Sequence, residues 1–182
     1  MTFDIKYINQ FINVTSKAAV ASFNLVGKKD KIAADQAAVD AMRSELNKID
    51  MTGEIVIGEG SLDNAPMLFT GEILGKKTGP QFDIAVDPLE GTNFAANNLP
   101  GALSVIAVAD KGNLLKAPET YMHKIATGKV EKGLIDLDYS VKTNIKNLAE
   151  FKNTSPSNLT ACVMDRPRHK EIIDELSDLK VK

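Results

Sequence analysis

Residues 82–108 read FDIAVDPLEGTNFAANNLPGALSVIAV, and this stretch decides where the sheet and the acidic residues of the chain lie. The run FDIAV is typical of a buried strand, with one acid, Asp83, inside it. Two further acids, Asp87 and Glu90, come at the end of the run. Pro88 separates them and predicts that the chain leaves the sheet here, because proline cannot continue a central strand.

The spacing of Asp87 and Glu90 predicts that their carboxylates converge on one point across the turn. Carboxylates at close range repel each other and raise each other's pKa unless a cation lies between them. Oxygen ligands of this kind suit Mg²⁺ or Mn²⁺, and the backbone carbonyl of Leu89 is a further candidate ligand. A third acid, Glu59, follows the apolar run IVI between two glycines. The pattern therefore indicates a metal site.

Gly91 and Thr92 follow these acids directly. Glycine permits a close backbone approach, and amides at a helix start are suited to bind a phosphate. Each acid taken alone also fits a solvated turn residue or a helix cap, which is the common role of such residues. Two acid-bearing strand ends with glycine neighbours favour the metal interpretation.

The composition is that of an ordinary globular protein: 182 residues, 43% hydrophobic and 25% charged, with a net charge of −2. Because 22 basic residues face 24 acidic ones without a basic cluster, we expect no nucleic-acid partner. A single cysteine, Cys162, excludes an intramolecular disulfide and suggests a reducing compartment. No run is long enough to span a membrane, and the N-terminus does not read as a signal peptide. We therefore expect a cytoplasmic protein without a membrane partner.

Hydrophobic periodicity predicts an α+β protein in which N-terminal helices pack on a mixed sheet. In the first predicted helix, Ile5, Ile8, Ile12 and Phe23 recur at helical spacing. The expected helices are 4–26, 34–49, a short one within 64–75, 140–151 and 168–179. The expected strands are 52–60, 84–86, 103–109, 121–127 and 159–165.

The domain organisation predicted from this order is an N-terminal metal- and phosphate-binding α+β domain, 1–135, and an incomplete second α/β domain, 136–182. After the last predicted helix only KVK follows, where a strand–helix alternation would start another strand. The alternative is a complete protein with a frayed C-terminal helix.

Four stretches carry a resemblance to a known family: KIAADQAAVDAMR, IVIGEGSLDNAPMLFTGE, DIAVDPLEGT and ALSVIAVADKGNLLKAPETYMHKI. KGLIDL and RPRH add to it. The sequence resembles the magnesium-dependent, lithium-sensitive sugar and inositol phosphatase superfamily, and within it class II fructose-1,6-bisphosphatase of the GlpX type. The match runs along nearly the whole chain and corresponds to the N-terminal half to three-fifths of a family member.

This resemblance implies a layered α/β sugar-phosphatase fold and metal-dependent hydrolysis of the 1-phosphate of fructose-1,6-bisphosphate. It extends to sedoheptulose-1,7-bisphosphate as a second substrate and to a role in gluconeogenesis or glycerol metabolism. It implies Mg²⁺ or Mn²⁺ as cofactor and a homo-oligomer, dimer or tetramer. The metal ligands that it implies are Asp35, Glu59, Asp87, Glu90 and the carbonyl of Leu89. The residues that it implies for activation of the attacking water are Asp35 and Thr92. The substrate contacts that it implies are Glu90, Gly91, Thr92, Tyr121, Arg166 and Arg168.

Two other functions stay open at this point. One is a phosphatase similar to inositol monophosphatase. The other is a catalytically silent chain that binds metal or sugar phosphate, because the C-terminal acid that completes the family's metal site has no counterpart before Lys182. Without the resemblance, Asp35 reads as a helix N-cap, Tyr121 as a half-buried strand residue and the two arginines as a solvated helix start.

Overall fold

The structure is a computed structural model that describes residues 4–60, 66–118 and 120–182. It divides into two compact units, residues 1–119 and 120–182, and each is described by itself. Compactness alone does not define independently folding domains, so the predicted domains 1–135 and 136–182 remain a prediction. Within the described ranges, no helix has the length and apolar character needed to cross a membrane.

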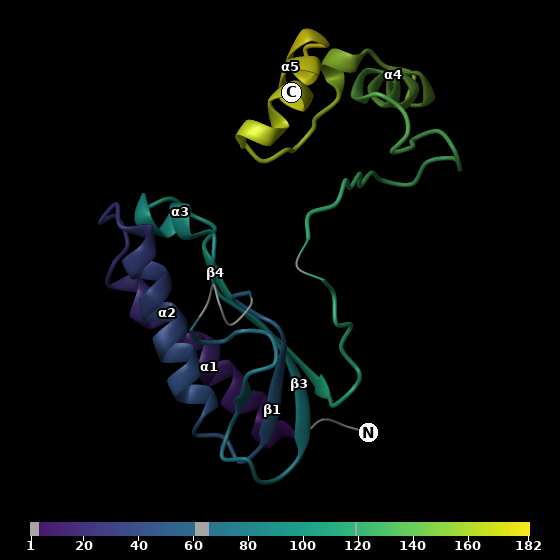
Figure 1. The fold of residues 1–182 in the computed structure, drawn as a ribbon. Coiled ribbons are helices and arrows are strands. Elements are labelled where there is room, and N and C mark those ends of the chain that lie inside the picture. Colours follow the sequence, from purple (N-terminus) through teal and green to yellow (C-terminus); the bar gives the residue numbers. More distant parts are fainter. Residues whose placement is uncertain (1–3, 61–65, 119) are drawn as a thin grey trace. The chain divides into compact units, whose positions relative to one another are not determined.

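Two helices and a four-stranded sheet form the layers of the first unit (Figure 1). The helices are α1, Ile5–Phe23, and α2, Lys31–Leu46. The strands are β1, Thr52–Ile57, β2, Ile73–Leu74, β3, Gln81–Glu90, and β4, Leu103–Asp110, in the order β2-β1-β3-β4. Strand β3 pairs in parallel with β1 and antiparallel with β4, so the sheet is mixed. The predicted α+β class is confirmed.

Both long helices begin where an aspartate caps them. Asp4 Oδ1 accepts a hydrogen bond from the Lys6 amide at 2.9 Å, and Asp30 Oδ1 accepts one from the Ala33 amide at 2.9 Å. Such caps satisfy amides that have no partner inside the helix. The bare N-cap interpretation of Asp35 therefore does not hold, because Asp30 takes that position.

The core lies between the helices and one face of the sheet. The face of α1 that packs in this core is not the one that carries its isoleucines. Phe11 packs edge-to-face on Phe82 of β3, with ring centroids 5.9 Å apart. Ile5 and Ile12 are 72% and 57% exposed. The sequence predicted the helix correctly but did not identify its buried face, because apolar residues occur all around it.

Three predicted elements are absent from the described residues. In place of a helix within 64–75, residues 66–72 form bends and a turn before β2, and residues 64 and 65 lie outside the described residues. A backbone amide of this segment hydrogen-bonds to the sheet instead of within a helix: Gly71 N donates to Ile55 O at 2.7 Å. Residues 121–127 and 159–165, all of them described, form no strand.

The second unit contains two α-helices, as predicted: α4, Val141–Phe151, and α5, Lys170–Asp178. The Ser140 hydroxyl accepts a hydrogen bond from the Thr143 amide at 3.1 Å and caps α4. Short 3-10 turns lie at Pro156–Asn158 and Pro167–His169. The Lys182 amide donates to Leu159 O at 3.0 Å, and Lys182 O accepts from the Ala161 amide at 2.8 Å. These two hydrogen bonds join Lys182 to residues 159–161, which are not part of a strand.

One close backbone contact makes a prediction about stability. A Cβ added to Gly58 would lie 2.0 Å from the carbonyl oxygen of Leu68, which backbone movement alone can relieve. We expect Gly58→Ala to lower the free energy of unfolding by roughly 1–3 kcal/mol, as overpacking does. Urea denaturation followed by far-ultraviolet circular dichroism measures it.

The matched control is Gly128→Ala, since nothing lies within 4 Å of a Cβ added there. It should change stability by less than about 0.5 kcal/mol. Equal stability of the two variants would contradict the packing of the Leu68 carbonyl on Gly58.

Candidate metal and phosphate site

The acids of the site lie on a bulge at the end of β3. The register with β4 runs to Asp87 opposite Val105 and resumes at Glu90 opposite Leu103, so β3 has one extra residue here. Pro88 therefore does not end the strand, which corrects the prediction that the chain leaves the sheet at this residue. A bulge tolerates proline because the local ladder is already interrupted, and it turns side chains to new directions.

The turn after the bulge is held locally. The Leu89 amide donates to Asp87 Oδ1 at 3.2 Å, and the Leu89 side chain is buried in the core. Gly91 has a φ of 82°, a left-handed conformation that glycine adopts without strain. Its carbonyl accepts from the Phe94 amide at 2.8 Å, and Thr92 is the first residue of the short helix α3, Thr92–Ala96.

Asp87 is a carboxyl group that resists ionisation. Its pKa is raised to about 6, first by burial, then by a hydrogen bond with the Glu90 side chain and by the negative charge of Glu90. The charge of Asp35 raises the pKa further, and the Leu89 amide opposes it. Three of the predicted site residues are therefore brought into electrostatic contact by two elements, β3 and α2.

Asp35 lies in the second turn of α2, partly buried. Burial raises the pKa of its carboxyl group. Its neighbours Ala34 and Ala38 are fully buried against the sheet, so the packing of α2 fixes where Asp35 emerges.

Glu59 follows the end of β1, the parallel neighbour of β3. The last register pair of these strands is Ile57 with Ala85, and two residues further along each chain are Glu59 and Asp87. Parallel strands end at the same edge of a sheet, so both acids belong to this edge. The Glu59 amide donates to Leu68 O at 3.0 Å.

The donors at this edge fit a hard divalent cation in their chemistry. They are carboxylate oxygens, and none of the ion pairs between described residues involves Asp35, Asp87 or Glu90. A cation would offset both the burial of Asp87 and the repulsion from Glu90, which raise the pKa of Asp87. In the part of the chain that the structure describes, however, no three acid, histidine or cysteine side chains are grouped closely enough to hold a metal ion. The full ligand set of Asp35, Glu59, Asp87, Glu90 and Leu89 therefore stays a prediction.

The predicted substrate contacts Tyr121, Arg166 and Arg168 belong to the second unit. The Arg168 guanidinium lies 4.5 Å from the centre of the Tyr121 ring, a cation–π contact. Tyr121 is 85% exposed, so it is not the half-buried strand residue that its sequence context also allows. Arg166 and Arg168 are exposed at the turn before α5.

The third acid of the opening stretch, Asp83, has a structural role. It is 1% exposed in the middle of β3, and its Oδ2 accepts from the amides of Gly112 at 2.7 Å and Leu114 at 3.3 Å. Beside it on β1, Glu54 pairs with Lys116 at 2.9 Å, which lowers the pKa of Glu54. These contacts hold the segment after β4 against the sheet.

Sequence reasoning missed a second pair of charged residues near the site, Arg43 and Glu72. Glu72 is 7% exposed, and Arg43 Nε donates to its Oε1 at 2.7 Å. Nothing in the motif FTGE indicates that its acid, Glu72, is buried. The burial would be predictable only if Arg43, far away in the sequence, were already known to be its partner.

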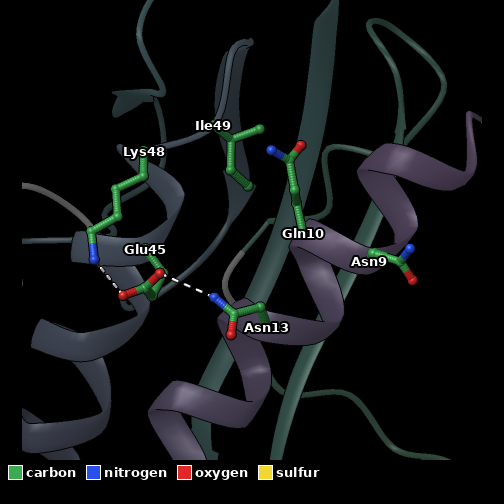
Figure 2. Close-up of a pocket in the computed structure, with 6 residues that line it drawn as sticks. All are labelled: Asn9, Gln10, Asn13, Glu45, Lys48 and Ile49. Atoms are coloured by element: carbon green, nitrogen blue, oxygen red, sulfur yellow. Dashed lines mark hydrogen bonds and ion pairs between the residues drawn. The ribbon is translucent and has the colours of Figure 1, made fainter.

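A pocket of about 240 Å³ lies away from these residues, between α1 and the end of α2 (Figure 2). In it Glu45 accepts from Asn13 Nδ2 at 3.1 Å and pairs with Lys48. Gln10 Oε1 is buried there without a hydrogen-bond partner among the described residues. None of the predicted site residues lines this pocket.

Comparison with known proteins shows sequence similarity along nearly the whole chain. The sequence pattern of the glpX-encoded bacterial fructose-1,6-bisphosphatases matches residues 6–182. A D-fructose 1,6-bisphosphatase class 2/sedoheptulose 1,7-bisphosphatase of Synechococcus sp. (strain CC9311) is 47% identical over 95% of this chain and 52% of its own length. The protein of the same name from Prochlorococcus marinus (strain MIT 9312) is 47% identical over 93% of this chain and 51% of its own length.

These matches place the chain in a family of sugar-bisphosphate phosphatases. It belongs to the glpX-encoded bacterial fructose-1,6-bisphosphatase family, class II. The chain spans about half the length of the curated relatives it matches.

The raised pKa of Asp87 predicts a pH dependence of stability. Because the folded chain binds this proton more tightly than the unfolded chain, the free energy of unfolding should fall as the pH rises from about 4 to about 6. Asp87→Asn removes this loss and should be more stable than the parent above pH 6, with no gain near pH 4. The gain should be about 1 kcal/mol, since partial exposure screens the charges. Urea denaturation without divalent metal, at a series of pH values, measures it.

The control is Asp40→Asn, an exposed acid on α2. Its stability should follow that of the parent at every pH. If the free energies of unfolding of Asp87→Asn and the parent differed by the same amount at every pH in this range, the raised pKa of Asp87 would be contradicted.

Proposed function

We propose that the protein hydrolyses the 1-phosphate of fructose-1,6-bisphosphate to give the monophosphate and phosphate. One observation carries the proposal: over 95% of its length, the chain is 47% identical to a relative named D-fructose 1,6-bisphosphatase class 2/sedoheptulose 1,7-bisphosphatase. The arrangement of DPLEGT at a strand end, with Asp87 and Glu90 in mutual contact, supports it.

The cofactor in this proposal is Mg²⁺ or Mn²⁺, held by Asp35, Glu59, Asp87 and Glu90 with the Leu89 carbonyl. A divalent ion bound there supplies charge neutralisation on the phosphoryl oxygens and lowers the pKa of water. The mutual contact of Asp87 and Glu90 supports their part in this ligand set, because a pair of unneutralised carboxylates is costly without a cation.

Thr92 and Asp35 orient the attacking water in this proposal. The Thr92 hydroxyl accepts a hydrogen bond from the water or donates one to it, and the Asp35 carboxylate takes its proton. Asp35 is partly buried on α2 and its charge acts on Asp87, which supports its place beside the proposed ligands.

The remaining predicted contacts hold the substrate. The residues proposed for the reacting phosphate are Glu90, Gly91 and Thr92. Arg166 and Arg168 supply planar donors that suit a phosphate, and the packing of Arg168 on Tyr121 supports a shared role for these two side chains. Sedoheptulose-1,7-bisphosphate is the second proposed substrate, since the relatives carry both names.

One observation favours a second candidate, a silent chain that binds metal or sugar phosphate. The described residues hold no group of three acid, histidine or cysteine side chains suited to a metal ion. Phosphate release from fructose-1,6-bisphosphate, sedoheptulose-1,7-bisphosphate and inositol 1-phosphate, with Mg²⁺ or Mn²⁺, separates these functions. Metal binding without any phosphate release would favour the silent chain.

The proposal further includes a cytoplasmic location, expected from the composition, and a homo-oligomer, dimer or tetramer, from the resemblance. Sedimentation of the purified protein at several concentrations tests the assembly.

Asp87→Asn should lower kcat/KM for fructose-1,6-bisphosphate by on the order of a thousandfold, because it removes a negatively charged ligand of the proposed metal ion. Circular dichroism should show an unchanged fold. Asp40→Asn serves again as the control and should keep full activity. Near-normal turnover by Asp87→Asn would overturn its assignment as a ligand.

Thr92→Val should lower kcat by roughly a hundredfold while KM stays within about threefold, because the hydroxyl contributes more to orienting the attacking water than to holding the phosphate. Thr92→Ser retains the hydroxyl and should keep most of the activity. A change confined to KM in Thr92→Val would contradict this role. Steady-state phosphate release measures both constants.

A further inference from the structure

We propose that Arg43 and Glu72 are positioning residues for Glu59, and that they set the affinity of the site for its divalent ion. The inference rests on the proposed function, because it takes Glu59 as a metal ligand. Neither residue stands among the ligands, water-activating residues or substrate contacts described above.

The chain of contacts begins on α2. Arg43 Nε donates to Glu72 Oε1 at 2.7 Å, and the side chain of Glu72 is 8% exposed while that of Arg43 is 40% exposed. The other oxygen, Glu72 Oε2, accepts from the Leu68 amide. Both carboxylate oxygens of a buried acid are therefore used, one by a helix and one by the turn before β2.

The turn held by Glu72 in turn holds the backbone of Glu59. Leu68 O accepts from the Glu59 amide at 3.0 Å, and the Thr70 amide donates to Gly60 O at 3.0 Å. The Leu68 carbonyl packs so closely on Gly58 that a Cβ there would lie 2.0 Å from it. The residues on both sides of Glu59 are thus fixed by the same turn.

Leu68 adopts a conformation that needs this support. Its φ is 54°, in the left-handed region that a leucine rarely adopts, and its side chain is fully buried. Strained backbone of this kind persists only where the surroundings over-determine it. The Glu72 carboxylate and the core are those surroundings, so loss of the carboxylate charge or of its arginine should release the turn.

Helix α2 carries both Arg43 and another predicted site residue. Asp35, eight residues before Arg43 on the same helix, raises the pKa of Asp87 by its charge. Helix α2 therefore presents one carboxylate to the site directly and sets the position of Glu59 through Arg43 and Glu72. Partners of metal ligands commonly set metal affinity in this way.

The test measures Mn²⁺ binding to the parent, Glu72→Gln, Arg43→Met and Arg43→Lys by electron paramagnetic resonance of free Mn²⁺ and by calorimetry. Glu72→Gln and Arg43→Met should bind Mn²⁺ roughly 10- to 100-fold more weakly. Arg43→Lys keeps the charge and should recover part of the affinity. In hydrogen exchange, the amides of Glu59 and Thr70 should exchange faster in the two weak variants.

Steady-state kinetics should separate an effect on metal binding from an effect on the chemical step. In Glu72→Gln the Mn²⁺ concentration for half-maximal activity should rise by the same factor as the dissociation constant. At saturating Mn²⁺, kcat should return to within about twofold of the parent. A merely structural pair would lower stability without moving the Mn²⁺ requirement.

The matched control is Lys76→Met, which breaks another ion pair of the same unit, Lys76 with Asp50 at 3.1 Å. It should leave Mn²⁺ affinity unchanged. If Arg43→Met fails to fold, Glu72→Gln decides, since it keeps the side-chain volume but removes the charge that binds Arg43 and the Leu68 amide. Unchanged Mn²⁺ affinity in folded Glu72→Gln overturns this inference alone. A parent chain that binds no Mn²⁺ overturns the proposed function and this inference together.

Discussion

The parallel pairing of β1 with β3 is the constraint on which the rest of the first unit depends. It places the ends of two strands at one edge of the sheet, and each end carries a glycine-flanked acid motif. Glu59 and Asp87, far apart in sequence, come to the same edge because parallel strands end together. Antiparallel pairing of the same two strands would place these acids at opposite edges.

The packing of α2 on this sheet adds a further acid, Asp35, to the two strand ends. Its alanines allow a close approach of the helix, and Asp35 is then near enough to Asp87 for its charge to act there. The result is concentrated negative charge at a partly buried position, which proteins retain where a cation or a proton is to be held. Membership of a fructose-1,6-bisphosphatase family is consistent with such a site, since phosphoryl transfer depends chiefly on neutralised charge.

Four acids of this unit show that environment, and not residue type, decides the role of a carboxylate. Asp83 and Glu72 are buried: two backbone amides donate to Asp83 Oδ2, and Arg43 and the Leu68 amide donate to the two oxygens of Glu72. Glu54 pairs with lysines at the surface of the sheet. Asp87 is partly buried beside another acid, Glu90, and burial first and then Glu90 raise its pKa. The first three stabilise the scaffold, whereas Asp87 remains available for a ligand.

The sequence by itself determined the secondary structure that has a local cause. The helices with aspartate or serine caps and the apolar strands β1, β3 and β4 were predictable, because capping and periodicity are properties of adjacent residues. The motifs also identified the family. Only the tertiary structure decided that Pro88 sits on a bulge, that α1 buries Phe11 rather than Ile12, and that residues 159–165 form no strand. It alone joined Arg43 to Glu72 and Asp35 to Asp87, because these contacts depend on how a helix lies on a sheet and leave no mark on neighbouring residues in the chain.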